Sequence, residues 1–247
     1  VLQGRVSGVS VSTNSGQPGS ASTVRVRGVT TFNTYGGNNP LWVVDGVVVD
    51  GGGIGFVNQS DIESVEVLKD AASLAIYGAR AASGVIMITT KKGKAGKITV
   101  NYNGFSGFSG PAKKVELLNA TQYGAIMNEK AGAAGQNLPF PSLANLGAGT
   151  DWQSEIFNQN AFRYSQELSI SGGNEVSTFF SSFSIQNQEG IVTTNISDYN
   201  KISLRLNSTH KISKIFSVGE NLGWTQQKSK GLGNTNSEYG GPLSSAL

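Results

Sequence analysis

The sequence predicts a mixed α+β unit that is followed by a series of antiparallel β-strands. The first observation is a strand–helix–strand pattern within residues 61–93, and the second is a set of segments after residue 97 that alternate apolar and polar residues. The third is composition, with 33 glycines and only 14% charged residues, against about 25% in typical soluble domains. No run reaches the roughly 20 apolar residues of a membrane-spanning helix. This excludes helical membrane proteins but not β-barrels.

The first fifty residues contain short predicted strands that are joined by glycine-rich turns. The segment Val6–Val11 indicates a short strand. The segment Val24–Gly28 alternates valine and arginine, which predicts a strand with one apolar and one basic face. Asp45 and Gly46 lie between two valine-rich runs. They predict a two-residue hairpin turn, because both residue types tolerate positive φ.

The stretch 61–93 is the most compact pattern in the chain. Residues 62–68 form a β-branched apolar run and predict a strand. Asp70 is placed as the N-cap of a short helix over residues 71–77, because its carboxylate can accept a free backbone N–H. Gly78 follows, where a left-handed residue ends a helix at the lowest cost. The run Val85–Thr90 predicts a second strand.

Alternating segments of about ten residues dominate the chain after residue 94. They are interrupted by a predicted helix, Asn119–Ala134, capped by Asn119 or Thr121, and by a predicted loop, Pro139–Gly149. Such segments are typical of transmembrane barrel strands, which face lipid on one side and a polar lumen on the other. A soluble β-sandwich also alternates, so the pattern alone leaves both architectures open. The predicted strands are Lys97–Phe108, Phe162–Ser171, Val176–Gln186, Tyr199–Ser208 and Phe216–Trp224. In the fourth of them the apolar face holds Ile202, Leu204 and Leu206, and the polar face holds Lys201, Ser203, Arg205 and Asn207.

The sequence contains no pattern that indicates catalysis or metal binding. It lacks cysteine, and its single histidine, His210, lies at a predicted turn. No HExxH, GxSxG or P-loop pattern occurs, and no helix start follows the glycine-rich segment Asp50–Gly55. The net charge is +3, and the basic cluster Lys91–Lys97 is interpreted as a solvated strand end, because no aromatic residues interleave it. We therefore predict no enzyme activity, no cofactor, no metal site and no nucleic-acid partner.

The wording of the stretch SVEVLKDAASLAIYGARAASGVIMITTKKG, residues 64–93, resembles the plug domain of TonB-dependent outer-membrane transporters of the SusC/RagA type. The phrase PLWVVDGV, residues 40–47, is similar to the PLYVVDGV of the same family, and Val24–Gly28 is similar to its IRG-type strand end. This resemblance favours the barrel over the sandwich. The residues that match the plug motif are Asp45, Gly46, Asp70, Tyr77, Gly78, Arg80 and Gly84.

The resemblance implies a protein of the cell outer membrane. Residues 1–95 are expected to form the plug, and residues 96–247 the first strands and loops of a transmembrane β-barrel that has 22 strands in the family. The sequence is accordingly interpreted as an internal piece of a longer protein. Family members import glycans or peptides, driven by the proton-motive force. The implied partners are the TonB-ExbB-ExbD complex at the periplasmic side, a SusD-like surface lipoprotein, an oligosaccharide or peptide substrate, and outer-membrane lipid. The alternatives are a soluble carbohydrate-binding β-module and a secreted enzyme fragment.

The resemblance also implies a latch between the plug and the barrel. Arg27 and Lys69 match positions at which plug domains carry basic residues that pair with carboxylates on the inner barrel wall. Arginine suits this role because its planar guanidinium can bind a carboxylate bidentately, whereas lysine offers a point charge. The polar segment Thr30–Asn39 and the glycine-rich segment Asp50–Gly55 are expected to form plug surface.

Overall fold

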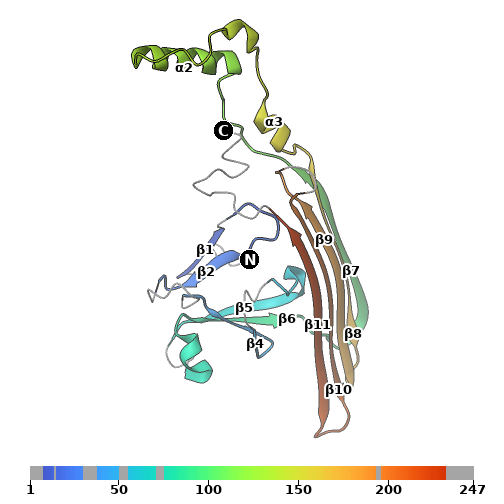
Figure 1. Ribbon diagram of the computed structural model, residues 1–247. Helices are drawn as coiled ribbons and strands as arrows, with labels where there is room; N and C mark the ends of the chain where they lie inside the picture. Colours follow the sequence, from blue (N-terminus) through green and yellow to red (C-terminus); the bar gives the residue numbers. More distant parts are fainter. Residues whose placement is uncertain are drawn as a thin grey trace. The chain divides into compact units, whose positions relative to one another are not determined.

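The computed structural model of the protein describes residues 8–13, 15–29, 38–49, 55–70, 75–192 and 196–231. These residues belong to two compact units, one within residues 1–107, 163–188 and 198–229, and the other within residues 108–162, 189–197 and 230–247. The first unit contains two parts that we name here. The N-terminal region comprises the described residues up to Lys94, and the wall sheet comprises strands β7–β11 (Figure 1).

The N-terminal region contains two small sheets. Strands β1 (Val9–Thr13) and β2 (Ser22–Val26) form an antiparallel pair. The second sheet has the order β4-β3-β6-β5, in which β3 pairs with β6 in parallel and the other neighbours are antiparallel. Its strands are β3 (Leu41–Val44), β4 (Val47–Val49), β5 (Ile62–Leu68) and β6 (Val85–Thr90). The predicted strands of this region are present with shifted ends. Strand β1 continues to Thr13, while Val6 lies outside the described residues, and β2 ends at Val26, after which Arg27 adopts a φ of 61°.

The predicted hairpin at Asp45 and Gly46 is confirmed. Val44 pairs with Val47, so these two residues alone form the turn between β3 and β4. Their φ values are 47° and 86°, the positive values that a type I′ turn requires at both central positions. This turn fixes the place of the Asp45 carboxylate.

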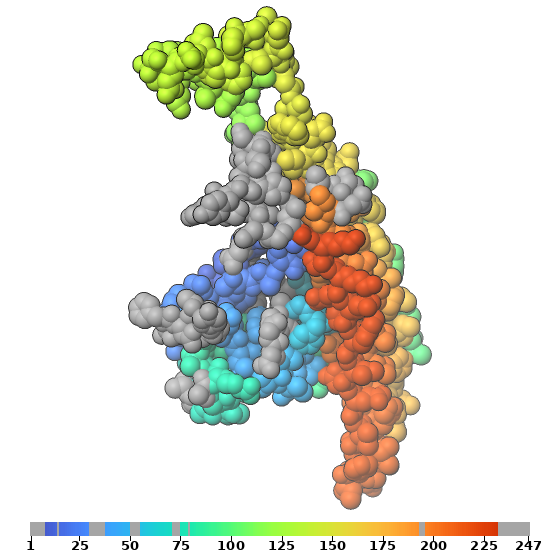
Figure 2. All heavy atoms as spheres, viewed as in Figure 1, coloured from blue at the N-terminus to red at the C-terminus, as the bar shows by residue number. Residues whose placement is uncertain are grey.

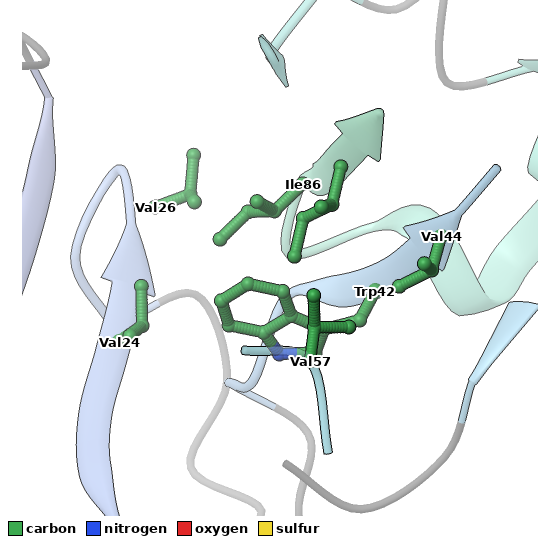
Figure 3. Close-up of a cluster of buried hydrophobic side chains, with 7 residues drawn as sticks. Val24, Val26, Trp42, Val44, Val57 and Ile86 are labelled. Atoms are coloured by element: carbon green, nitrogen blue, oxygen red, sulfur yellow. The ribbon is translucent and has the colours of Figure 1, made fainter. Parts of the chain in front are cut away.

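The core of the N-terminal region lies between its two sheets. Figure 3 shows the Trp42 indole among Val24 and Val26 of β2, Val57 and Ile86. All of these side chains are buried, and burying apolar surface at roughly 25 cal/mol per Å² is the main favourable term in folding. The region therefore has a hydrophobic core of its own.

The predicted helix over residues 71–77 is only partly covered by the structure. Residues 71–74 lie outside the described residues, so the N-cap role of Asp70 stays a prediction. The visible part, Ala75–Ala81, is a 3-10 helix (η2) that is kinked at Gly78, where φ is 66° and ψ is −159°. Gly78 thus has the expected positive φ, and its non-helical backbone separates two short helical stretches, the first of which ends there as predicted. Most of the predicted loops Thr30–Asn39 and Asp50–Gly55 also lies outside the described residues.

The wall sheet contains five long strands in consecutive order, β11-β10-β9-β8-β7 (Figure 1). Each predicted strand is confirmed and is longer than expected. The strands are β7 (Gly96–Ser109), β8 (Ala161–Gly173), β9 (Ser177–Glu189), β10 (Asp198–Lys211) and β11 (Ser217–Lys230). The predicted turn at residues 209–214 is shifted, because β10 continues to Lys211.

The two faces of the wall sheet are inverted relative to a soluble protein. On β10 the polar face is buried, whereas Leu204 on the opposite face is 42% exposed. A soluble β-sandwich buries its apolar face, so this arrangement favours a barrel wall, which turns its apolar face to lipid. The buried polar residues of β9 and β10 are Ser182, Ser184, Lys201, Ser203, Arg205, Asn207 and Ser208.

The second unit contains helix α2 (Ala120–Ala133), which confirms the predicted helix. Asn119 is its N-cap and forms a capping box with Gln122, so Asn119, not Thr121, starts the helix. The predicted loop at residues 139–149 includes a 3-10 turn, η3 (Leu143–Asn145). A short helix, α3 (Trp152–Ile156), was not expected from the sequence. Within the described part of the chain, no helix is long and apolar enough to cross a membrane.

Replacing Gly84 with alanine is expected to weaken the packing of β2 against the second sheet. Gly84 has a φ of 91°, and a Cβ at this position would lie 2.9 Å from Cβ and Cγ1 of Val26, which is fully buried. Backbone strain and the clash together are expected to lower the free energy of local opening by about 2–4 kcal/mol. Amide hydrogen exchange of β2 and β6 in the purified full-length protein measures this change.

Gly28→Ala is the matched control. Gly28 has a similar φ of 84°, but no heavy atom lies within 4 Å of its Cβ position. Only the strain of roughly 1–2 kcal/mol is expected there. Equal effects of the two substitutions would show that the close approach of Val26 is unimportant.

Candidate functional site

The contact between the N-terminal region and the wall sheet is centred on Arg205 of β10. Nη1 of Arg205 lies 3.6 Å from Oδ2 of Asp45, and Nε lies 3.8 Å from Oδ2 of Asp61. Asp45 comes from the β3–β4 turn, and Asp61 ends the 3-10 turn η1 (Gln59–Asp61) immediately before β5. All three side chains are less than 10% exposed. One wall cation therefore binds two separate parts of the N-terminal region.

Neutral donors complete the surroundings of the Asp45 carboxylate. The backbone N–H of Thr90 donates to Oδ1 at 2.8 Å, and the Thr90 hydroxyl donates to Oδ2 at 2.6 Å. Nδ2 of Asn221, on β11, donates to Oδ2 at 2.6 Å, and Oδ1 of the same amide accepts from Arg205 at 3.1 Å. Asn207 of β10 donates to the Thr90 hydroxyl at 3.0 Å. The charge of Asp45 is thus compensated by hydrogen bonds from both sides of the contact.

The two carboxylates have opposite pKa shifts. Burial acts to raise the pKa of Asp45, but the hydrogen bonds from Thr90 and Asn221, together with Arg205, outweigh it, and the pKa is lowered from 3.8. Burial also raises the pKa of Asp61, and the hydrogen bond from Ser182 and the charge of Arg205 do not fully offset it. Ionised Asp45 therefore stabilises the fold above pH 3.8, and this contribution is lost as pH falls through its lower folded pKa. Ionisation of Asp61 as pH rises above 3.8 has the opposite sign and costs stability.

A second group of wall side chains binds backbone carbonyls of residues 55–57. Nζ of Lys201, which is buried, donates to the carbonyl of Gly55 at 2.6 Å, and Gln227 donates to the same oxygen. The hydroxyl of Thr225 donates to the carbonyl of Phe56 at 2.8 Å. In Figure 2, atoms of β10 and β11 (orange to red) lie against atoms of the N-terminal region (blue to cyan), where these bonds form.

Two glycines allow the N-terminal region and the wall sheet to approach closely. A Cβ on Gly93 would lie 2.3 Å from the backbone N of Phe179 on β9. A Cβ on Gly19 would lie 2.2 Å from the ring of Tyr199 on β10. A side chain at Gly93 would require movement of the β9 backbone, and one at Gly19 would require movement of the Tyr199 ring. The contact thus depends on small residues as well as on charge.

The two predicted latch residues, Arg27 and Lys69, do not take part in the contact around Arg205. Arg27 lies 4.0 Å from Asp70, and both side chains are largely exposed. Nζ of Lys69 lies beside Gly8, within the N-terminal region. The ion pair of Arg27 is therefore made within the N-terminal region, and the role of Arg27 and Lys69 as a latch stays a prediction. Of the residues that make the contact with the wall, Asp45 was singled out from the sequence only as a turn and plug-motif residue. Lys201, Arg205 and Asn207 were assigned to one polar face without a role in binding.

The other residues that match the plug motif are three glycines, a tyrosine and an arginine. Gly46, Gly78 and Gly84 all adopt positive φ. The Tyr77 hydroxyl lies 3.9 Å from Sδ of Met87, and its ring packs on the small core cluster around Val43 and Val85. Arg80 is exposed.

His210 is a half-buried residue of β10. Its ring nitrogens lie 3.0 Å from Oγ of Ser177 and 2.9 Å from Oγ of Ser208. Among the described residues, no group of three potential metal ligands occurs.

Replacing Arg205 with methionine is expected to weaken the contact strongly. The substitution keeps most of the side-chain volume but leaves the buried carboxylates of Asp45 and Asp61 without their cation. Breaking one buried pair in this way typically costs about 3–5 kcal/mol. The free energy of local opening of residues 57–61, from amide hydrogen exchange in the full-length protein, measures it.

Lys94→Met is the matched control. Lys94 lies 3.5 Å from Glu63, but this pair is exposed, and about 0–1 kcal/mol is expected. The triple variant Arg205→Met, Asp45→Asn, Asp61→Asn should recover much of the loss, because no charge is then left unpaired. A triple variant no more stable than Arg205→Met would contradict this explanation and assign the effect to lost packing.

Residues 1–85 match the family of TonB-dependent receptor plug domains. Among curated proteins, the chain is 41% identical to the TonB-dependent receptor SusC of Bacteroides thetaiotaomicron over 203 residues, which are 78% of this chain and 19% of that protein. It is 37% identical to the TonB-dependent receptor P26 of Formosa agariphila over 225 residues, which are 88% of this chain and 22% of that protein. The chain therefore spans about a fifth of the length of these relatives.

Solved structures agree with this relationship. The RagAB peptide importer in its open-open state superposes with a TM-score of 0.79 at 27% identity, covering 92% of this chain and 28% of that chain. The siderophore receptor PirA from Acinetobacter baumannii superposes with a TM-score of 0.54 at 16% identity, a likeness that shows the fold alone. The plug match, the relatives and the wall strands agree, and the chain belongs to the TonB-dependent receptors of the SusC/RagA type, which are proteins of the outer membrane.

Proposed function

We propose that the full-length protein is an active importer of the outer membrane. In this proposal residues 1–95 form the plug, and residues 96–247 form the first strands and loops of a barrel that has 22 strands in all. The observation that carries the proposal is the polar contact around Arg205, which joins the N-terminal region to the polar face of the wall sheet. Such a contact suits a plug inside a barrel lumen, whose wall is polar.

Coupling to an energy source is consistent with this kind of contact. We propose that the TonB-ExbB-ExbD complex pulls on the plug from the periplasmic side. The contacts that would break are hydrogen bonds and ion pairs, such as those of Lys201 and Asn207, and water can replace them. Because these contacts are polar, we propose that a modest force can move the plug while its hydrophobic core stays buried.

The proposed substrate is an oligosaccharide or a peptide, and the proposed partner is a SusD-like surface lipoprotein. Support comes from the relatives, since one is SusC itself and another is the RagAB peptide importer. The polar wall face supports a hydrophilic cargo, because its side chains offer both donors and acceptors.

The function is tested in the native organism by deleting the gene and measuring uptake of oligosaccharide and peptide mixtures. Deletion should abolish uptake of one class, and complementation in a strain without TonB should fail to restore it. Affinity purification from native membranes should recover a lipoprotein with the protein. Unchanged uptake after deletion, together with repeated purification without a lipoprotein, would count against the proposal.

We further propose that Arg27 and Lys69 pair with carboxylates on the inner wall of the barrel. Arg27→Ala in the full-length protein, at matched surface level, should increase passage of a large antibiotic several-fold, because the plug is held less firmly. Arg25→Ala, two residues earlier in β2 and also exposed, is the control. Wild-type leakage and uptake in the Arg27→Ala variant would mean that Arg27 is only a solvated residue that contacts Asp70.

A further inference from the structure

The polar face of the wall sheet carries a second arginine, Arg163 of β8, in very different surroundings from those of Arg205. The Ser182 hydroxyl of β9 binds Asp61, so the even-numbered residues of β9 face the N-terminal region. Arg163 pairs with Gln188, and Glu167 pairs with Ser184, which places Arg163 on this same face. Unlike Arg205, however, Arg163 is exposed.

The guanidinium of Arg163 is held by an aromatic ring. Its Cζ lies 5.1 Å from the ring centroid of Phe105 on β7. A cation in this position over an aromatic ring is favourable, and the contact restricts the long side chain. A side chain that is already ordered loses less entropy when it binds a ligand. Phe105 is itself 52% exposed, an unusual position for an aromatic residue on a polar wall.

The positive charge of Arg163 is not matched within the described residues. All ion pairs in the described part of the chain involve other residues, and none brings a carboxylate within 4.0 Å of Arg163. Arg205, by contrast, has two carboxylates at that distance. Arg205 and Arg163 lie on one face of the wall sheet. Two carboxylates neutralise Arg205, whereas no carboxylate of the described residues neutralises Arg163.

We propose that Arg163 binds a carboxylate group of the imported substrate. This inference rests on the proposed function and specifies its substrate as acidic. The guanidinium fork matches the two oxygens of a carboxylate, and a charge-assisted pair of this type is stronger than a neutral hydrogen bond. Phe105 acts as a positioning residue that fixes the direction of the fork.

Amide side chains surround this position and suit the rest of such a ligand. Gln188 pairs directly across from Arg163, Gln186 lies two residues along the same face of β9, and Asn103 lies two residues from Phe105 on β7. Each amide offers both donors and an acceptor, which can bind sugar hydroxyls or peptide groups. A carboxylate can come from an acidic peptide or from a uronate sugar, and the experiment separates these sources.

The test uses the full-length protein in outer-membrane vesicles and four probes. Two are an acidic tripeptide and its fully amidated counterpart, and two are a uronate trisaccharide and its carboxyl-reduced counterpart. Binding is measured for the wild type, Arg163→Gln, Arg163→Lys and the control Lys228→Gln, an exposed cation of the opposite strand face. Hydrogen exchange of β8 and β9 confirms that each variant is folded.

The wild type is expected to prefer the acidic member of one probe pair about tenfold, and that pair identifies the source. Arg163→Gln should remove the preference, Arg163→Lys should keep about a threefold preference, and Lys228→Gln should keep it fully. Equal wild-type binding of acidic and neutral probes, or a preference that survives Arg163→Gln, overturns this inference alone. A wild type that binds none of the four probes and imports no peptide or oligosaccharide contradicts the proposed function, and the inference with it.

Discussion

The ion pairs of Arg205 with Asp45 and Asp61 are the interaction on which the contact between plug and wall depends. Three charged groups leave water to form it, and each is costly to bury unless all three are present. Such a group adds little net stability over an apolar core, but only one arrangement of the two carboxylates satisfies it. We infer that its main effect is to fix the position of the plug on β10. The β3–β4 turn and η1 hold the two carboxylates at the required places.

The other contacts between plug and wall are also polar, whereas the interior of the plug is apolar. Trp42, Val26 and Ile86 form a dry cluster, whereas the wall is met by amides, hydroxyls and backbone carbonyls. Each hydrogen bond contributes about 0.5–1.5 kcal/mol net, because water can take the place of either partner. The plug is therefore held by many exchangeable contacts around one firm ionic centre. A plug that must move can keep its own core while its outer contacts are exchanged with water.

Features that depend on neighbouring residues could be predicted from the sequence. The Asp45–Gly46 turn, the strands of the three sheets and the Asn119 cap all arise from local chemistry, and the structure confirms them. The positive φ at Gly78 was also expected. The short helix α3 was missed, because a five-residue helix leaves no periodic signal. Alternation alone could not separate a barrel from a sandwich. The resemblance to plug domains was needed for that, and the buried polar face of β10 now agrees with it.

The ionic centre could not be predicted, because its residues are far apart in sequence. The charges in it are also reversed relative to the expectation that basic plug residues pair with an acidic wall, since here the wall supplies the cation and the plug supplies the carboxylates.

The wall face thus uses arginine in two ways that the sequence does not distinguish. Arg205 and Arg163 both occupy polar positions of alternating strands, and local composition around them is similar. They differ in their surroundings in space. The plug brings two carboxylates to Arg205, whereas, within the described part of the chain, Arg163 contacts the ring of Phe105 on β7. A buried arginine without counter-ions would be untenable, but an exposed arginine on an aromatic ring is stable while its hydrogen-bonding edge stays free. The covered part of the wall is accordingly fixed by charge, and the open part keeps a charge for a ligand.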